Sequence, residues 1–566
     1  MKSNEKQFSD NCATSEGGNR HTPANRLKEA GIHPEPRLLR NNSSLMRSNR
    51  LLQAACAVAT GALVLCTTPL RAGEVTVILT KVDDGEAKHV PNDVHQDDNF
   101  TLFREGSIPL TAVDPGRPVK IAVDGTRTFQ TMYGYGAAMT DSSAWMLMNL
   151  KRKNPQLYEY TMKKLFSPTE GAGFSFLRLP MGASDYTASA TYYTYCDERS
   201  PDLSRFSIAH DRQYIIPMLR DALRLNPEIR ILGSPWSAPA WMKTNGKLTG
   251  ISEADKAAGA TCKLRSDCFE AYADYFVKFI EQYRAEGIEI WGVTLQNEPQ
   301  FDGAAYPCMR MNEDDQIRLV SLLGPKLAAK GLKTKIFIHD HNWGLHPGDR
   351  KVIGGDVKIA PLLSVTKILS DPTAGKYIAG TAWHCYYGDA NLMRKTYNTI
   401  HQRFPDKEIL CTEHGGWGKK RGDWWGDVDW GMAHSWMGGP QNWCQASVEW
   451  NLALDGKFGP TPRPDSEAAG LAVIQTDNYQ EVKFEREFYG MAQMSRAARP
   501  GSKHIAASFK GDDPGGMGIV AFALPNGQTS LVVFNKNKTE QSFQVEADGK
   551  FFDFLAPGHS IVTFVW

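Results

Sequence analysis

The sequence lacks a membrane-length hydrophobic run, an excess of charge of either sign and the cysteine spacings of a zinc site. The apolar stretch Leu51 to Leu65 is shorter than the roughly 20 residues that a membrane span needs, so an uncleaved anchor is the less favoured interpretation. Lys and Arg number 64 against 63 Asp and Glu, a net charge of +1, which indicates neither nucleic acid nor an anionic membrane as a partner. No C-x-x-C or Cys/His zinc spacing is present. The composition therefore predicts an uncharged partner.

The first 73 residues differ in character from the rest of the chain. Residues 1–45 are polar and have no periodic apolar face, so we expect either disorder or an over-extended reading frame. Residues 46–73 have the order of a secretory signal, with a basic start, the apolar stretch and small residues at the end. We predict a signal peptide starting near Met46, a secreted protein (extracellular or periplasmic), and no stable membrane insertion after cleavage.

Seven of the ten cysteines follow the predicted signal, and an odd number cannot pair completely. Export permits disulfides, and Cys262 and Cys268, close together in a loop-like insert, are the predicted pair. The alternative is that all seven are small buried residues or free thiols.

From about Phe129 onward, short apolar runs alternate with amphipathic stretches. Residues 268–287 are typical of the latter, with apolar side chains every three or four positions and a final glycine that marks a helix end. Near-continuous apolar strands alternating with helices predict an α/β fold with a parallel sheet, and eight runs predict closure into a (β/α)8 TIM barrel. An open doubly wound sheet is the alternative, but no Gly-rich dinucleotide loop follows the first run. The runs are YGYGAAM (133–139), FSFLRLPMG (174–182), IRILGSPW (229–236), IEIWGVTLQNE (288–298), TKIFIHDHNW (334–343), IAGTAWHCYY (378–387), EILCTEHGG (408–416) and QASVEWNLAL (445–454).

Both ends of the chain beyond the signal alternate apolar and polar residues, as antiparallel strands do. We predict that residues 74–124 and 464–566 form one antiparallel β-sandwich beside a catalytic barrel at 125–463. The last barrel helix, at about 482–496, falls inside the second of these segments.

Polar residues end every one of the eight runs, where the strands of a barrel meet at one mouth. Two glutamates stand at such ends on opposite sides of the ring, Glu298 on the fourth strand and Glu413 on the seventh. Two facing carboxyl groups suit glycosidic hydrolysis, because one protonates the leaving oxygen and the other meets the positive charge at the sugar carbon. The other strand-end residues are Thr140, Asp141, Arg178, Ser184, Asp185, Trp236, Asn297, Asp340 to Trp343, His384 to Tyr387, His414 and Glu449 to Asn451.

Seven segments occur in an order and spacing that carry a family resemblance. They are FQTMYGYGAAMTDSSA, FLRLPMGASDY, LGSPWSAPAWMKTNG, VTLQNEP, HCYYG, CTEHGGW and VEWNLALD. Over about Glu74 to Trp566 the chain resembles glycoside hydrolase family 30, in the branch of glucosylceramidases and microbial β-1,6-glucanases. The resemblance implies a retaining β-glucosidase-type enzyme without metal or cofactor. Its substrate would be a β-glucoside, a glucan oligosaccharide or a glycolipid.

The resemblance also implies roles for particular residues. Glu298 would be the acid/base and Glu413 the nucleophile, so Glu298 needs a raised pKa and Glu413 a lowered one. Arg178 matches an inward basic residue that would help to keep Glu413 ionised. The residues expected around the glucosyl unit or beside the nucleophile are Asp141, Trp236, Asn297, His384, Tyr386 and Trp450. Asn297 would contact the 2-hydroxyl, where a hydrogen bond strengthens as the oxocarbenium ion forms.

Two departures from the family bear on the substrate. Cys385 stands where the glucosylceramidases have a tryptophan, which argues against a lipid-like aglycone. A Gly/Asp-rich loop after the nucleophile holds Trp417, Trp424, Trp425 and Trp430, which either stack on further sugars or pack the loop onto the barrel. Hydrolysis of a β-xylosidic or β-fucosidic bond is the alternative within the family. A carbohydrate-binding protein without turnover is the alternative outside enzymes, and the presence of both glutamates argues against it.

The segment FIHDHNWGLHPGD contains residue types that bind metals. In a regular strand, His339 and His341 share one face and Asp340 points to the other, so these three side chains do not converge on an ion. We predict no metal here. Asp340 and Asn342 are expected to hydrogen-bond sugar hydroxyls or to brace the site.

Overall fold

The computed structural model describes residues 73–82, 100–345, 360–415, 424–463, 466, 468–512 and 514–566. The predicted extension at 1–45 and all of the predicted signal except Gly73 lie outside the described residues, so both stay predictions. From Thr68 onward the chain forms one compact unit. None of the helices in the described ranges has the length and apolar character that crossing a membrane requires.

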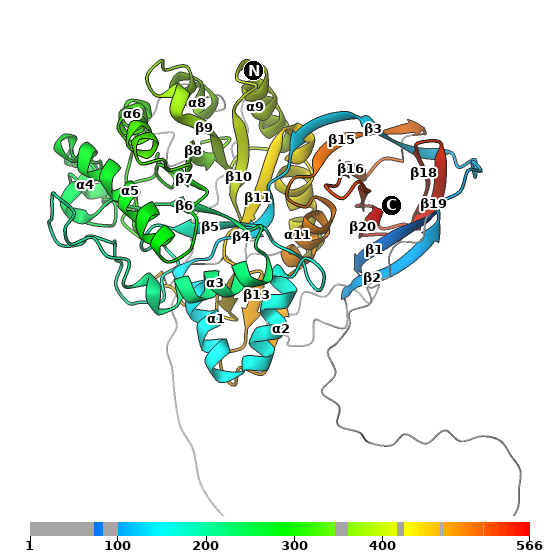
Figure 1. Ribbon diagram of the computed structural model, residues 1–566, viewed down its shortest axis with the longest axis horizontal. Helices are drawn as coiled ribbons and strands as arrows, with labels where there is room; N and C mark the ends of the chain where they lie inside the picture. Colours follow the sequence, from blue (N-terminus) through cyan, green and yellow to red (C-terminus); the bar gives the residue numbers. More distant parts are fainter. Residues whose placement is uncertain are drawn as a thin grey trace, which may run out of the picture. The chain divides into compact units, whose positions relative to one another are not determined.

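Eight parallel strands form the barrel, in the order β4-β11-β10-β9-β8-β7-β6-β5 (Figure 1). A parallel bridge between Ala138 and Arg178 joins the first strand of this order to the last and closes the ring. The predicted (β/α)8 barrel is therefore confirmed, and the alternative prediction of an open doubly wound sheet is wrong. The strands are β4 (Gly134–Ala137), β5 (Phe176–Pro180), β6 (Arg230–Ser234), β7 (Gly292–Thr294), β8 (Lys335–Asn342), β9 (Ile378–His384), β10 (Glu408–His414) and β11 (Cys444–Glu449).

Helices follow the barrel strands along the chain, as the alternating pattern predicts. In α5 (Phe269–Ala285) the side chains of Tyr272, Phe276 and Ile280 are buried, and Gly287 just beyond the helix has φ 78°, the left-handed conformation that commonly ends a helix. The other helices are α1 (Asp141–Lys153), α2 (Pro155–Phe166), α3 (Ile215–Leu225), α4 (Glu253–Ala257), α6 (Glu313–Ala329), α8 (Ala360–Leu369), α9 (Ala390–Arg403), α10 (Trp424–Gly431) and α11 (Arg486–Ala497).

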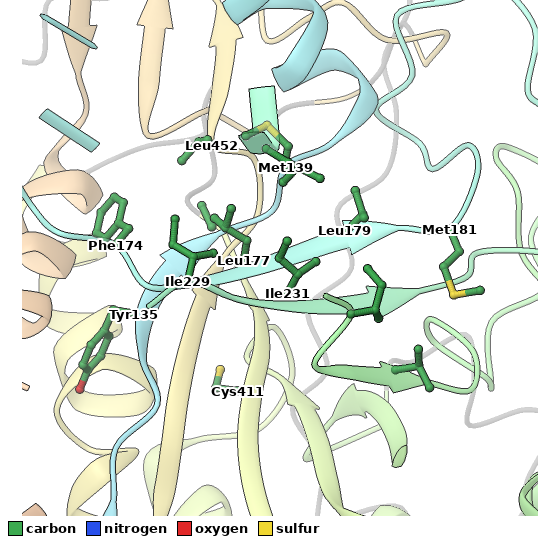
Figure 2. Close-up of a cluster of buried hydrophobic side chains, with 14 of the residues drawn as sticks. Tyr135, Met139, Phe174, Leu177, Leu179, Met181, Ile229, Ile231, Cys411 and Leu452 are labelled. Atoms are coloured by element: carbon green, nitrogen blue, oxygen red, sulfur yellow. The ribbon is translucent and has the colours of Figure 1, made fainter. Parts of the chain in front are cut away.

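The alternation of side chains along β5 places an arginine inside the barrel. Leu177 and Leu179 belong to a large hydrophobic cluster, part of which is drawn in Figure 2. The cluster also contains helix residues. Phe176 belongs to a separate cluster formed by barrel strands. Because successive side chains of a strand point to opposite faces, Arg178 shares the inner face with Phe176. The buried Arg178 charge thus lies next to the apolar side chain of Phe176 on the inner face of the barrel.

A nine-stranded sheet combines both ends of the described chain, in the order β19-β18-β3-β15-β16-β17-β20-β1-β2. All neighbours are antiparallel except β18 and β3. The sheet has its own hydrophobic cluster, with Val75 and Ile121 from the N-terminal strands packed among C-terminal side chains such as Phe543. The predicted β-sandwich from both chain ends is therefore confirmed. Its strands are β1 (Glu74–Val82), β2 (Phe100–Pro109), β3 (Val119–Thr131), β15 (Lys503–Gly511), β16 (Met517–Ala523), β17 (Thr529–Asn535), β18 (Gln541–Ala547), β19 (Lys550–Ala556) and β20 (Ser560–Val565).

The last barrel helix, α11, joins the two parts. The Gln493 side chain donates to Thr80 Oγ1 (2.8 Å) and accepts from Thr563 Oγ1 (2.6 Å), so it bridges β1 and β20. A small third sheet is formed by β12 (Ala453–Asp455), β13 (Ala472–Ile474) and β14 (Val482–Phe484). Its last two strands lie within the segment 464–566.

The predicted disulfide between Cys262 and Cys268 is wrong. All seven cysteines after the signal are buried free thiols. The Cys268 thiol lies at the start of α5, 3.7 Å from Asp267 Oδ1. The Cys262 thiol instead points to the chain at Cys308, with Sγ 3.4 Å from the Cys308 carbonyl oxygen.

Candidate active site

Glu298 and Glu413 belong to one cluster at the C-terminal ends of the barrel strands. Glu413 lies in β10, and Glu298 lies in the turn that follows β7. Glu298 has φ 47°, and its backbone N–H donates to Asp340 O (3.0 Å), which holds the turn against β8. His384, the last residue of β9, stands between the carboxylates, with Nδ1 3.4 Å from Glu298 Oε1 and Nε2 3.8 Å from Glu413 Oε2. The two predicted glutamates are thus brought together.

Arg178 lies at the centre of this cluster and is fully buried. Its Nη1 forms a short ion pair with Glu413 Oε2. Its Nη2 donates to Asn297 Oδ1 (2.7 Å) and to Asp340 Oδ2 (2.8 Å), and Ser234 Oγ also accepts from it (3.1 Å). A buried guanidinium satisfied by two carboxylates is stable only while both remain ionised. The arginine therefore fixes the positions of the carboxylates around it.

Asp340 is the second carboxylate of this arrangement. Burial alone would raise its pKa, but the Arg178 charge, followed by the hydrogen bond and charge of His384, holds the pKa of Asp340 well below its ordinary value. His384 Nε2 is 3.2 Å from Asp340 Oδ1, and Thr412 Oγ1 donates to the same oxygen (2.7 Å). Asp340 thus orients the imidazole that faces Glu298, which is the bracing role that the sequence allowed for it.

Glu298 is surrounded by two imidazoles and a phenol. Its Oε1 is 3.4 Å from His384 Nδ1 and 3.5 Å from His341 Nδ1, and Tyr306 Oη donates to its Oε2 (3.4 Å). Burial by itself would raise the pKa of Glu298, but the hydrogen bonds and charges of the two histidines lower it below its ordinary value. The expected raised pKa of Glu298 is therefore not found. For His384, burial opposes the charged form, but the neighbouring carboxylates, Glu413 first, raise its pKa.

A bulge in β8 determines which polar side chains enter the site. The register against β9 shifts between His339 and His341, and His339 and Asp340 have φ 78° and 53°. The prediction that His339 and His341 share a face is therefore wrong. Asp340 and His341 both reach the site, whereas the His339 ring packs against Trp383 with ring centroids 4.3 Å apart.

Two tryptophans form an aromatic wall beside Arg178. Trp236 follows β6 and Trp450 follows β11, and their rings stack with centroids 5.0 Å apart at 22°. The Arg178 guanidinium carbon lies 4.7 Å from the Trp236 ring centroid and 5.7 Å from that of Trp450. Flat apolar faces next to buried polar groups suit the faces and the hydroxyls of a sugar ring.

Tyr386 contacts the second glutamate directly. Its hydroxyl donates to Glu413 Oε1 at 2.9 Å, so each oxygen of this carboxylate has a donor, the other being Arg178. The backbone N–H groups of Tyr386 and Tyr387 donate to Asn342 Oδ1 at 2.9 and 3.1 Å. Asn342 therefore braces the loop after β9.

Asp141 is the one predicted sugar-binding residue whose hydrogen bonds all go to groups outside this cluster. The hydrogen-bond partners of its carboxylate are the Ala188 N–H, Tyr193, His210 and Tyr214, at 2.7 to 3.2 Å. The side chain begins α1 and is buried. Its contact with a sugar stays a prediction.

Asp185 joins the site without having been among the predicted sugar-binding residues. It follows β5 and is buried, and Arg463 Nη1 lies 3.3 Å from its Oδ2. Burial raises the pKa of Asp185 to about 7, with Arg463 opposing the shift and Glu413 and Glu298 adding to it. The sequence signal that could have identified Asp185 was its position at the end of a strand. Arg463 also lies over the Tyr306 ring (4.8 Å), and no sequence pattern indicated either residue.

Within the described residues, one group has the spacing to hold a metal ion. Glu298, His341 and His384 each offer a ligand atom, and these atoms lie within 4.8 Å of one another. The group includes the predicted acid/base, so a metal bound there would occupy the carboxylate that must donate a proton. The predicted absence of a metal stays a prediction.

The tryptophan loop is described only in part. Trp417 and the side chains of Trp424 and Trp425 lie outside the described residues. Trp430 is 38% exposed, stacks on His434 with centroids 3.8 Å apart, and donates from Nε1 to Cys385 O (3.3 Å). This tryptophan packs the loop onto the barrel while leaving part of its ring exposed.

Comparison with family models gives two adjacent matches. Residues 132–497 match the glycosyl hydrolase family 30 TIM-barrel domain, and residues 501–564 match the glycosyl hydrolase family 30 beta sandwich domain. The boundary between the two matches falls directly after α11.

Individual relatives agree with these matches. The chain is 31% identical over 464 residues to the endo-1,6-beta-D-glucanase neg1 of Aspergillus fumigatus, covering 79% of this chain and 87% of the relative. It is 29% identical to the lysosomal acid glucosylceramidase of Mus musculus, covering 80% and 84%. Among solved structures, the endo-beta1,6-glucanase BT3312 superposes with a TM-score of 0.73 at 29% identity, covering 87% of this chain and 99% of that one.

Proposed function

The chain belongs to glycosyl hydrolase family 30, which makes it a hydrolase of β-glycosidic bonds, and we propose that it cleaves β-1,6-linked glucan with retention of configuration. The observation that carries the proposal is the cluster of Glu298 and Glu413 around His384 and Arg178. Two carboxylates at one barrel mouth supply the acid and the nucleophile that double displacement requires.

In the first step Glu413 attacks the anomeric carbon. Arg178 and the Tyr386 hydroxyl each bind one of its oxygens, which orients the carboxylate for attack. Glu298 gives a proton to the leaving oxygen, so that the glycosidic bond breaks as the glycosyl-enzyme forms. Asn297, held by Arg178, is placed for the 2-hydroxyl, where contact strengthens in the transition state.

In the second step Glu298 takes a proton from water, which attacks the same carbon and releases Glu413. His341 Nδ1 and His384 Nδ1 lie 3.5 and 3.4 Å from Glu298 Oε1, so a proton can pass between these three side chains. A proton held on either imidazole is thus within one short transfer of Glu298 Oε1, from which it can pass to the glycosidic oxygen. In this way a lowered pKa of Glu298 is compatible with acid catalysis.

The side chains beside Glu298 support a sugar rather than an apolar tail as leaving group. Tyr306 contacts Glu298, Arg463 lies over Tyr306, and Asp185 pairs with Arg463. These hydroxyl, guanidinium and carboxyl groups can hydrogen-bond the hydroxyls of a sugar aglycone. Acyl chains would remove water from the same groups without replacing its hydrogen bonds, which costs free energy. The buried Cys385 offers no aromatic surface to such chains.

The test is a hydrolysis assay on three substrates: a β-1,6-glucan oligosaccharide, an aryl β-glucoside and glucosylceramide. We expect turnover of the glucan, with the β-anomer as first product in a proton NMR time course, and little turnover of glucosylceramide. An α-anomeric first product would refute retention, preferred turnover of glucosylceramide would refute the substrate, and no turnover of any would refute the enzyme proposal. We further propose that residues 46–73 direct secretion, which N-terminal sequencing of the exported protein tests.

A further inference from the structure

Two free cysteines lie where two loops at the barrel mouth are joined. Cys262 belongs to the insert after β6, and Cys308 belongs to the loop that follows Glu298. The Arg310 N–H donates to Cys262 O (2.8 Å), and the Cys308 N–H donates to Leu248 O (3.2 Å). Bridges between Thr249 and Pro307 and between Lys263 and Arg310 continue this pairing. The backbone therefore holds the two cysteines side by side although 46 positions separate them in sequence.

The two thiols are close together and closed off from solvent. Cys262 and Cys308 are 0% and 2% exposed. Cys262 Sγ lies 3.4 Å from Cys308 O, and Cys308 Sγ lies 3.2 Å from Gly303 O. The backbone pairing and the contact of Cys262 Sγ with the Cys308 carbonyl bring the two cysteines close together, as a disulfide requires.

A buried lysine lies beside the two thiols, whose pKa values shift in opposite directions. Lys243 Nζ donates to Ser237 Oγ (2.9 Å), Leu248 O (2.6 Å) and Cys308 O (2.8 Å). The hydrogen bond from Cys308, and then the Lys243 charge working against burial, lower the pKa of Cys262 to about 7, while the pKa of Cys308 is raised. The thiolate is the reactive form of cysteine, so Cys262 is the attacking sulfur of the pair.

We propose that Cys262 and Cys308 form a disulfide bond by exchange with a small-molecule disulfide such as oxidised glutathione. The Cys262 thiolate attacks one sulfur of the small disulfide, which forms a mixed disulfide and releases one small thiolate. Cys308 then loses its proton to solvent and attacks the Cys262 sulfur, which releases the second small thiol. Two protein thiols are oxidised and one small disulfide is reduced to two thiols. Because both sulfurs are buried, the exchange takes place when the two loops open or as the chain folds.

The bond would close a loop of the chain that contains Glu298. It would tie the insert after β6 to the segment carrying Tyr306, whose hydroxyl donates to Glu298 Oε2. Closing a loop of this length restricts the unfolded chain, so the oxidised protein should melt about 5 °C above the reduced one. This chemistry does not depend on the proposed function.

Peptide mapping tests the proposal on the unmodified chain. The reduced protein is incubated with oxidised glutathione, both in the native state and during refolding, and is then alkylated and digested with trypsin. Cys262, Cys268 and Cys308 fall on different tryptic peptides, 257–263, 266–278 and 285–310. We expect 257–263 linked to 285–310 and two fewer thiols titrated in guanidinium. An unchanged thiol count under both conditions, or 257–263 linked to 266–278, would overturn the proposal.

Thermal unfolding with and without dithiothreitol supplies a second readout. Dithiothreitol should lower the midpoint of the oxidised wild type and leave Cys262→Ser and Cys308→Ser unchanged. Cys268→Ser, another buried thiol of the same insert, is the matched control and should respond as the wild type does. An equal response of all four proteins to dithiothreitol would refute the assignment. Turnover is not needed for either readout, so failure here is distinguishable from failure of the proposed function.

Discussion

Replacing Arg178 by methionine should weaken both folding and catalysis at neutral pH. The guanidinium is fully buried and pairs with Glu413 and Asp340, so its loss leaves two buried carboxylates without their guanidinium partner. Breaking a buried pair by removing one partner costs about 3–5 kcal/mol. Loss of the groups that orient Glu413 should lower kcat by about 10²–10³-fold, the effect of removing one preorganised donor.

The stability difference between the wild type and the Arg178→Met variant should change with pH in a definite direction. In the wild type the pKa of Asp340 is depressed, so its contribution to stability is present above the unfolded value of about 4 and is lost as the pH falls through the folded pKa. In the Arg178→Met variant, burial of Asp340 without the arginine favours the protonated form of this carboxyl group. The stability difference between the two proteins should therefore shrink as the pH is lowered from 7 to 5.

Guanidinium unfolding at pH 7 and 5, together with kcat on β-1,6-glucan, measures these effects. Arg486 is the matched control, since it is also buried and pairs with Asp427 (2.8 Å), but on α11 and α10 rather than beside Glu413. Arg486→Met should lose stability and retain kcat per folded molecule. An Arg178→Met variant that loses less than about 1 kcal/mol at pH 7, or that keeps wild-type kcat, would refute the reasoning.

Three further predictions concern the groups around the reacting bond. Glu413→Gln should abolish turnover of every substrate. Glu298→Ala should retain turnover of aryl β-glucosides, because their leaving group needs little protonation. If Glu298→Ala lost turnover of all substrates equally in steady-state assays, the assignment of Glu298 as the acid/base would be wrong. Tyr386→Phe removes the 2.9 Å hydrogen bond to Glu413 and should lower kcat about 10–100-fold with the melting temperature nearly unchanged, and an unaltered kcat would show that the bond does not orient the nucleophile. Because the folded pKa of Asp185 is raised from 3.8 to about 7, the contribution of Asp185 to stability should fall by at most about 4 kcal/mol as the pH rises from 4 to 7. Asp185→Asn should remove this contribution in urea unfolding, and a pH dependence equal to that of the wild type would contradict the raised pKa.

The barrel and the site at its mouth could be predicted from sequence because both depend on periodicity. Side-chain alternation in β5 places Arg178 inside, and the strand ends bring Glu298 and Glu413 to the same rim. These are consequences of local patterns repeated eight times, which single residues do not disturb.

The failures lie where local periodicity breaks or where loops meet. The bulge in β8 depends on the positive φ of His339 and Asp340, which regular alternation does not anticipate, and it brings His341 to Glu298. Arg463 and Tyr306 meet through loops far apart in sequence. The cysteine pairing failed for the same reason: nearness in sequence suggested Cys268, whereas the folded loops bring Cys262 to Cys308.

The position of β1 in the nine-stranded sheet has a consequence for the order in which the protein can be made. β1 (Glu74–Val82) is the first strand after the predicted signal, and it lies between β2 and β20, the last strand of the chain. During synthesis β1 therefore has one unpaired edge until β20 (Ser560–Val565) has been made. The nine-stranded sheet cannot complete its pairing before β20 is available, so its N-terminal and C-terminal strands must assemble together late in folding. Loss of only the last seven residues would remove all of β20, separate β1 from β17, and halt assembly of the sheet at its final step.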